Sequence, residues 1–192
     1  MTSIPTHLQD AKTLLSENGF ATGDTWYHGT SSALLASIQG QGLKRSGDKA
    51  LNEAASKTMA TIGNNYTESV EPVFLTQSKE LAYYWAQQTI RERSTRFEGE
   101  EQPIVLAVNL SDKQQAKVRP DVGAMSLLMM SVGEQFMTHL TEIYQENNIA
   151  GPDIELRSAD RMDYLNKLGM AYIDEDISRA CVQELSEPAL AN

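Results

Sequence analysis

The sequence is poor in cysteine and in positive charge. Its 192 residues include one cysteine, Cys181, so no internal disulfide can form and a cysteine-based zinc site lacks partners. We therefore predict a reducing compartment and no metal site. Lysine and arginine number 16 against 26 acidic residues, which gives a formal net charge of -10. Such a surface repels phosphate backbones, so broad binding of duplex nucleic acid is not expected.

Long apolar runs are also absent. Residues 1–23 lack the basic start and apolar core of a signal peptide, and the most apolar window, residues 122–140, is interrupted by polar residues and by glycine. We therefore predict a cytoplasmic protein without a membrane partner. That window is most typical of a core helix, although its methionines also suit a partner surface.

The composition is that of an ordinary globular chain, with 41% hydrophobic and 22% charged residues. Domains usually run about 100 to 200 residues, so we predict a single domain over residues 1–192. Within it, residues 1–24 carry an N-terminal helix at residues 6–18. Residues 111–168 form a mostly helical insert.

Apolar patterning predicts an α+β chain, because strands occur near both ends with helices between them. Strands are expected at residues 25–29, 73–76, 104–110, 170–174 and 179–185. Helices are expected after Ser31 or Ser32, at residues 79–93 with Ser78 as N-cap, and at residues 122–147 and 158–168. Gly29 reads as the start of a tight turn after the first of these strands.

Two polar segments are less regular. The polar composition of residues 44–71 predicts a long loop with one short helix near residues 51–62. Loops of that length often cover binding sites. Arg91, Arg93 and Arg96 form a basic cluster beside the glutamates of residues 98–101. This pattern is typical of a solvated helix end, with a phosphate clamp as the alternative.

The spacing around His28 carries the functional prediction. Residues 26–30 read Trp-Tyr-His-Gly-Thr, and a predicted helix then places Ile38 ten residues and Gly42 fourteen residues after His28. This segment resembles the donor site of the poly(ADP-ribose) polymerase and diphtheria-toxin-like ADP-ribosyltransferases. The resemblance implies their split antiparallel β-sheets with flanking helices, here with a helical insert, and NAD as substrate.

In that family the histidine binds a hydroxyl of the sugar next to the adenine, and the backbone of the following glycine pairs with the nicotinamide carboxamide. The resemblance thus assigns His28, Gly29 and Thr30 to NAD binding, with His28 also catalytic. A backbone N–H and C=O can hold a flat amide only where no side chain blocks its approach, which glycine allows.

A second segment resembles the strand, serine and helix of the same family, where a tyrosine stacks on the nicotinamide ring. Here residues 73–76 are followed by Ser78 and then by Tyr83, Tyr84 and Trp85. The resemblance assigns Ser78 and either Tyr83 or Tyr84 to NAD binding, with Tyr84 in the catalytic set. The alternative is that these aromatic side chains only pack the helix.

The chain departs from the family at the catalytic acid. Family enzymes usually carry a glutamate on a late strand, where it stabilises the oxocarbenium-like transition state. The matching place here holds Gly169 or Ala171. Glu175 is the assigned substitute and Glu155 the other candidate, although each also fits a plain surface carboxylate.

The sequence therefore predicts an NAD-dependent ADP-ribosyltransferase that transfers a single ADP-ribose and releases nicotinamide. It does not name the acceptor. One alternative is a non-catalytic module that binds NAD or ADP-ribose on the same fold. Another is an RNA 2′-phosphotransferase, which residues 27–30 also resemble, although residues 69–72 lack the arginines that hold the RNA phosphate. A last alternative is that His28 is only a structural residue.

Overall fold

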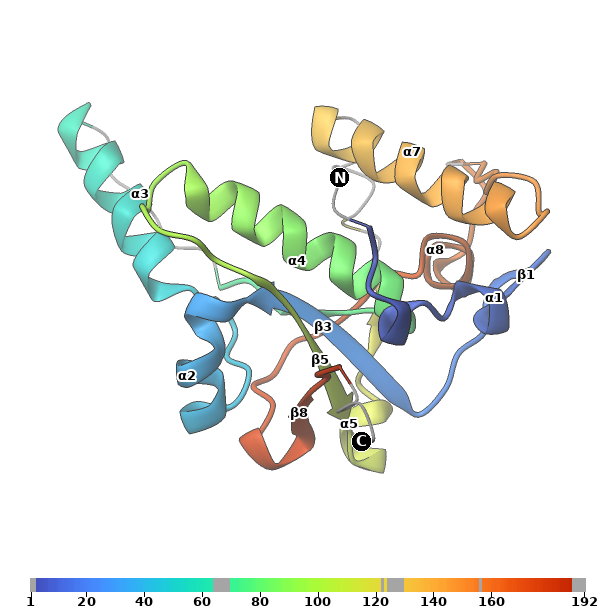
Figure 1. The fold of residues 1–192 in the computed structure, drawn as a ribbon, viewed down its shortest axis with the longest axis horizontal. Helices are drawn as coiled ribbons and strands as arrows, with labels where there is room; N and C mark the ends of the chain where they lie inside the picture. The colour runs from blue at the N-terminus through green and yellow to red at the C-terminus, as the bar shows by residue number, and fades with distance from the viewer. Residues whose placement is uncertain (1–2, 64–69, 122, 124–129, 156, 188–192) are drawn as a thin grey trace.

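The computed structural model describes residues 3–63, 70–121, 123, 130–155 and 157–187 (Figure 1). These residues form an α+β fold, as the sequence predicts. The strands are β1 (Leu15–Ser16), β2 (Gly19–Phe20), β3 (Thr25–Ser31), β4 (Val73–Leu75), β5 (Pro103–Asn109), β6 (Arg119–Pro120), β7 (Ala171–Ile173) and β8 (Val182–Glu184). The α-helices are α1 (Ala11–Leu14), α2 (Ser32–Gln41), α3 (Lys49–Thr61), α4 (Lys79–Ser94), α5 (Asp112–Gln115), α7 (Ser131–Glu146) and α8 (Arg161–Leu168). None of the helices described is long and apolar enough to cross a membrane.

Two three-stranded antiparallel sheets position the site. One has the strand order β3-β5-β8 and the other β4-β7-β6. They meet where Tyr27 and Thr76 exchange backbone hydrogen bonds of 2.8 and 2.9 Å. Because this contact joins β3 to the end of β4, His28 and Phe74 become neighbours although 46 positions separate them in the sequence.

Helix α4 packs directly on β3 (Figure 1). The approach is so close that a Cβ atom on Gly29 would lie 2.7 Å from Ala86 N and closer still to the carbonyl oxygen of Ala82. Glycine in mid-strand allows such contact. The expected tight turn at Gly29 is wrong, because β3 continues through this residue to Ser31.

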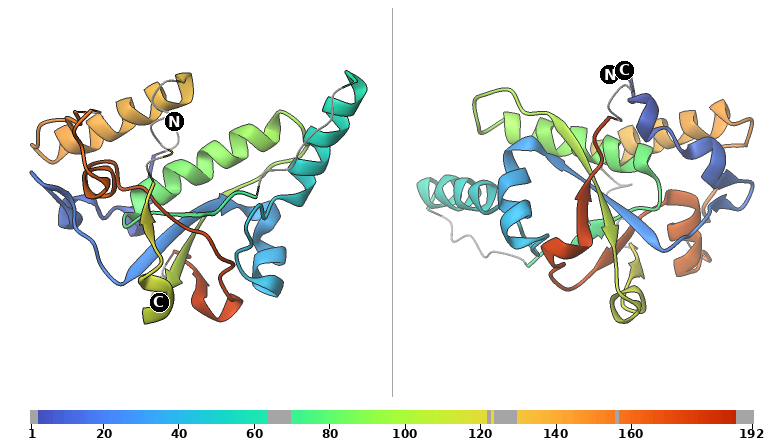
Figure 2. Two further views of the ribbon diagram at one scale, coloured as in Figure 1. Left: turned by 180° about the vertical axis from the view of Figure 1, so that it is seen from behind. Right: turned by 60° about the horizontal axis from the view of Figure 1, so that its bottom comes forward.

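Apolar side chains form two main cores on either side of this unit. One lies between α4, α7 and α8 and contains Tyr84, Phe136 and Leu168. The other lies between the sheets and α2 and contains Trp26 and Leu106. Figure 2 shows from behind that α7 lies on the side of α4 remote from β3, while α3 projects from the other end of the molecule.

The N-terminal helix expected at residues 6–18 is wrong. The chain forms a 3₁₀ turn at Thr6–Leu8, the single turn α1 and the hairpin β1-β2. Its path is fixed by α4, because the Asp10 carboxylate accepts the Lys79 N–H at 2.7 Å while the Glu80 carboxylate accepts the Asp10 N–H at 2.7 Å. This reciprocal capping satisfies backbone donors that a continuous helix would have used.

Most other predicted elements correspond to observed ones. The strands expected at residues 73–76, 104–110 and 170–174 are β4, β5 and β7, while residues 179–185 divide into a 3₁₀ turn and the short β8. Helix α2 begins after Ser31, whose side chain accepts the Ala33 N–H at 3.1 Å. The helix expected from residue 122 is α7; most of the segment before it lies outside the described residues. The single domain over residues 1–192 stays a prediction.

Candidate ligand-binding cleft

A cleft of about 360 Å³ lies between β3, α2, α3, β4 and the C-terminal end of α4. Small-molecule sites commonly have volumes of about 300 to 1,000 Å³. His28, Gly29 and Thr30 line it, so the segment singled out in the sequence forms one wall. Phe74 from β4 and Leu51 from α3 belong to other walls.

His28 has a defined tautomer in this cleft. Its Nδ1 lies 2.8 Å from the Phe74 carbonyl oxygen, which can only accept a hydrogen bond, so Nδ1 carries the proton. Burial of the ring lowers the pKa of His28 below its ordinary 6.5, although the bond to Phe74 acts in the opposite direction. At neutral pH the ring is therefore uncharged, and Nε2 is a hydrogen-bond acceptor for which no described residue supplies a donor.

Phe74 is the exposed aromatic side chain of the cleft. Its neighbours Val73 and Leu75 are buried in the core, and strand alternation turns Phe74 to the other side, where 46% of it is exposed. An exposed phenyl face beside a hydrogen-bonding imidazole can cover one side of a flat ring. The sequence prediction missed Phe74, because residues 73–75 are all apolar and their order does not show which side chain faces the cleft.

The tyrosines assigned to ring stacking lie elsewhere. Tyr84 is 2% exposed and stacks on His139 of α7 at 4.7 Å between ring centroids, and Tyr83 packs with Leu8 and Val105. Neither lines the cleft. The residues of α4 that do reach the cleft are Thr89 and Glu92. Because a helix turns by about 100° per residue, these two lie on a different face of α4 from both tyrosines.

Ser78 is the N-cap of α4, as the sequence predicts. Its Oγ lies 3.4 Å from the Leu81 N–H and donates to the Asp10 carboxylate at 2.8 Å. The side chain is fully buried and does not line the cleft. The side chain of Ser78 is therefore engaged in capping α4 and does not lie beside His28.

The two carboxylates considered as the catalytic acid also lie outside the cleft wall. Glu175 forms an ion pair with Lys117. Glu155 is exposed and accepts a hydrogen bond from the Arg157 N–H at 3.3 Å. Three other carboxylates do line the cleft, and the sequence prediction named none of them: Asp48, Glu71 and Glu92.

A late-strand carboxylate shares a row with His28. In the sheet β3-β5-β8, His28 is paired with Leu106 and Leu106 with Glu184. Residues paired directly across strands point to the same face, and two strand spacings amount to roughly 10 Å. Glu184 is not part of the cleft wall itself. The sequence prediction looked for the acid near β7, and so did not consider β8.

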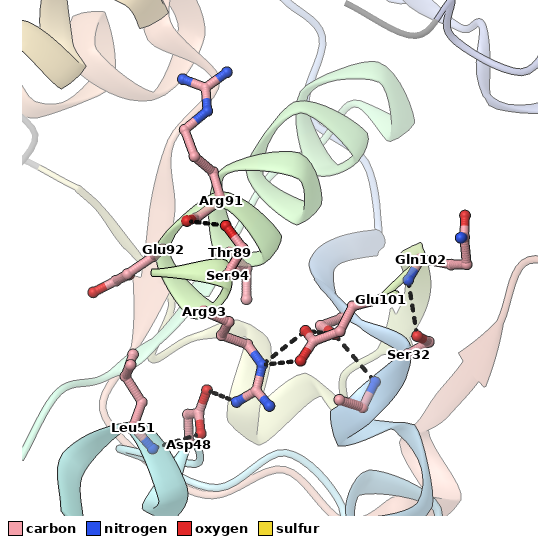
Figure 3. Close-up of polar contacts among 12 residues, drawn as sticks. Ser32, Asp48, Leu51, Thr89, Arg91, Glu92, Arg93, Ser94, Glu101 and Gln102 are labelled. Carbon is pink, nitrogen blue, oxygen red and sulfur yellow. Dashed lines mark hydrogen bonds and ion pairs between the residues drawn. The ribbon is translucent and has the colours of Figure 1, made fainter. Parts of the chain in front are cut away.

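The arginine cluster near the end of α4 divides into three environments. Arg91 donates to Gln135 of α7 at 2.7 Å, and Arg96 lines the cleft. Arg93 is only 6% exposed and donates through Nε to both oxygens of Glu101, at 3.1 and 2.8 Å. Figure 3 shows Arg91 and Arg93 pointing away from each other. The expectation of a solvated helix end is wrong for Arg93.

Comparisons of the chain with protein-family models, with curated proteins and with solved structures find no match. The resemblance to ADP-ribosyltransferases therefore stays a prediction. A function has to be argued from the residues that the fold brings together in this cleft.

Proposed function

We propose that the protein binds NAD in this cleft and transfers a single ADP-ribose unit to an acceptor with release of nicotinamide. The observation that carries the proposal is the pairing of His28 with Phe74, a hydrogen-bond acceptor beside an exposed aromatic face. The two small sheets that meet at Tyr27 and Thr76 support the split-sheet architecture that goes with this activity.

The reaction requires cleavage of one glycosidic bond. Nicotinamide leaves ribose C1′ with the bonding electron pair and becomes neutral, and an acceptor nucleophile then bonds to C1′ and loses its proton. In this proposal His28 Nε2 accepts a hydrogen bond from a ribose hydroxyl, and Phe74 covers one face of the nicotinamide ring. Both contacts hold the dinucleotide so that bond cleavage occurs at a fixed place.

A carboxylate near C1′ would stabilise the positive charge that develops there. Within the proposal, Glu71 replaces Glu175 in this role. Its backbone is held next to the cleft by Ser46, through hydrogen bonds of 3.1 and 2.8 Å, and three positions separate it from Phe74. Glu92, which reaches the cleft from α4, is the carboxylate to compare with it.

A non-catalytic NAD-binding module is the second candidate. It is favoured by the positions of Glu175 and Glu155, because neither late carboxylate reaches the cleft wall. Loss of one partner of the transition state commonly lowers the rate by about a hundredfold to a thousandfold, while ligand binding can persist.

Titration with NAD, followed by detection of free nicotinamide, separates the two candidates. We expect nicotinamide release that His28→Ala abolishes, that Phe74→Ala weakens through KM, and that Glu71→Gln lowers through kcat. His7→Ala and Met162→Ala are matched controls, because His7 lies outside this cleft and Met162 is an exposed apolar residue of α8. NAD binding without release in the wild type favours the module, and absence of binding contradicts both candidates.

A further inference from the structure

Helix α3 forms a wall of the cleft without being part of any core. Leu51 and Ala55 line the cleft, yet none of the helix's 13 residues is buried. An isolated helix of this length is marginal in water, so its position depends on contacts made at a few points. In both views of Figure 2, α3 extends away from the rest of the fold.

The N-terminus of α3 is attached to α4 by charge. Asp48 is the N-cap of α3 and accepts the Leu51 N–H at 3.1 Å. The same carboxylate receives a hydrogen bond and ion pair from Nη1 of Arg93, whose side chain is 7% exposed (Figure 3). Farther along, Arg96 reaches the Thr58 hydroxyl only at 3.5 Å, on the exposed surface.

Arg93 is attached in turn to the frame that carries His28. Its Nε contacts both oxygens of Glu101, and Glu101 accepts a hydrogen bond from Ser31, the last residue of β3. The N–H of Arg93 and the hydroxyl of Ser31 therefore meet on one carboxylate. A planar guanidinium can donate in two directions at once from fixed positions, which an ammonium group on a flexible chain does not reproduce.

We propose that Arg93 is a positioning residue that sets the place of α3 relative to the β3 wall, and with it the width of the cleft open to its ligand. The contact with Glu101 holds the guanidinium on the frame, and the contact with Asp48 holds the helix. The identity of the ligand rests on the proposed function. The placement of α3 by Arg93 does not rest on the proposed function, and it can be measured without any ligand.

Asp48→Asn tests the helix contact without removing the cap. Asparagine is as good an N-cap as aspartate, so the substitution removes the charge that pairs with Arg93 and leaves the local helix signal in place. Glu53→Gln is the matched control, because Glu53 is an exposed acid on the same helix and its substitution removes the same charge. Glu101→Gln weakens the opposite contact, on the frame side.

The first readout is backbone hydrogen exchange of the chain without ligand. We expect Asp48→Asn to speed exchange in residues 49–61 by about tenfold or more while α4 and β3 exchange as in the wild type. Glu53→Gln is expected to leave exchange unchanged, and Glu101→Gln to speed it in both α3 and the end of β3. Unchanged exchange of α3 in Asp48→Asn would overturn the proposal, whether or not the protein binds NAD.

The second readout is NAD affinity and turnover. We expect Asp48→Asn and Glu101→Gln, of which only Asp48 lines the cleft, both to raise Kd and KM by about tenfold with kcat close to that of the wild type, because His28, Phe74 and Glu71 are untouched. A fall in kcat with unchanged KM, or faster α3 exchange with unchanged affinity, contradicts the role of α3 in ligand binding. If the wild type binds no NAD, the proposed function fails, and the exchange experiment alone decides the role of Arg93.

Discussion

The two halves of helix α4 make opposite kinds of contact. In the first half, Leu81, Ala82, Tyr84 and Ala86 are all buried, against β3 on one side and α7 on the other. The buried carboxylate of Glu80, in the first turn, caps the N-terminal segment and does not face the cleft. In the second half, the buried residue is Arg93, an ion-paired cation. The cleft opens only along this second half. The comparison indicates that apolar burial by the first half stabilises the fold, while charge in the second half places the walls of the site.

If this division holds, the largest effect on stability should come from a substitution in the apolar core that the first half of α4 forms with α7. Phe136 of α7 is 1% exposed and stacks on Trp85 at 5.1 Å between ring centroids. Phe136→Ala should lower the free energy of unfolding by about 3–5 kcal/mol, because it removes a buried aromatic ring and leaves a cavity. Urea denaturation measures this, and NAD affinity should not change at temperatures where the variant is folded.

The matched control for Phe136 is Val132→Ala, an exposed position on the same helix. It should change the free energy of unfolding by no more than about 0.5 kcal/mol. A loss of NAD affinity in folded Phe136→Ala would show that the two halves of α4 are not separable, and a destabilisation as small as that of the control would show that α7 contributes little.

A smaller effect on the free energy of unfolding is expected at Gly29, which packs against the first half of α4 and also lines the cleft. A Cβ atom there would collide with the backbone of Ala82 and Ala86 in the first half of α4. Gly29→Ala should therefore lower the free energy of unfolding by about 3 kcal/mol in the absence of ligand, at the upper end of the range for overpacking, because the colliding atoms are backbone. The resemblance instead gave Gly29 a role in admitting a ligand.

Gly40→Ala is the control for this substitution. Gly40 lies in α2 with nothing near its added methyl group, so alanine should stabilise the helix by about 0.5–1 kcal/mol. Thermal unfolding of both variants without NAD distinguishes packing from ligand approach. An unchanged melting temperature in Gly29→Ala together with lost NAD affinity would favour the role that the resemblance implies.

The parts of the fold that follow from local patterns were predictable. Short apolar segments indicated β4, β5 and β7, and Ser31 and Ser78 cap α2 and α4 as expected. Residues 28–30, which the resemblance assigns to NAD binding, line one wall of the cleft, and their chemical roles stay predictions. In each case the signal lies within a few residues along the chain.

The parts that were missed depend on contacts between distant residues. The helix expected at residues 6–18 gives way to capping between Asp10 and Glu80, 70 positions apart. The buried Arg93 is paired with Asp48, which lies 45 positions away. The resemblance assigns Tyr83 or Tyr84 to a ligand, but the sequence does not show on which face of α4 the strand β3 lies. Such information exists only once the sheets and helices are assembled.

The smallest effect expected is a pH dependence from the charged half of α4. The hydrogen bond from Arg93, with that from Ser31, holds the pKa of Glu101 below its ordinary 4.5, although burial acts in the opposite direction. A carboxylate with a lowered folded-state pKa contributes stability that is complete above its unfolded pKa and is lost as the pH falls through the folded value. The wild type should thus lose stability below about pH 4.5 in part through Glu101.

Glu101→Gln removes this contribution, so its stability deficit relative to the wild type should shrink as the pH is lowered from about 6 to about 3. Glu98→Gln, an exposed glutamate of the same loop, controls for the loss of one carboxylate. Urea denaturation at each pH gives both differences. A deficit in Glu101→Gln that stays constant over this range would mean that folding does not change the pKa of Glu101, so the contact with Arg93 does not favour its ionised form. The second half of α4 would then not depend on charge, and the contrast with its apolar first half would fail at that point.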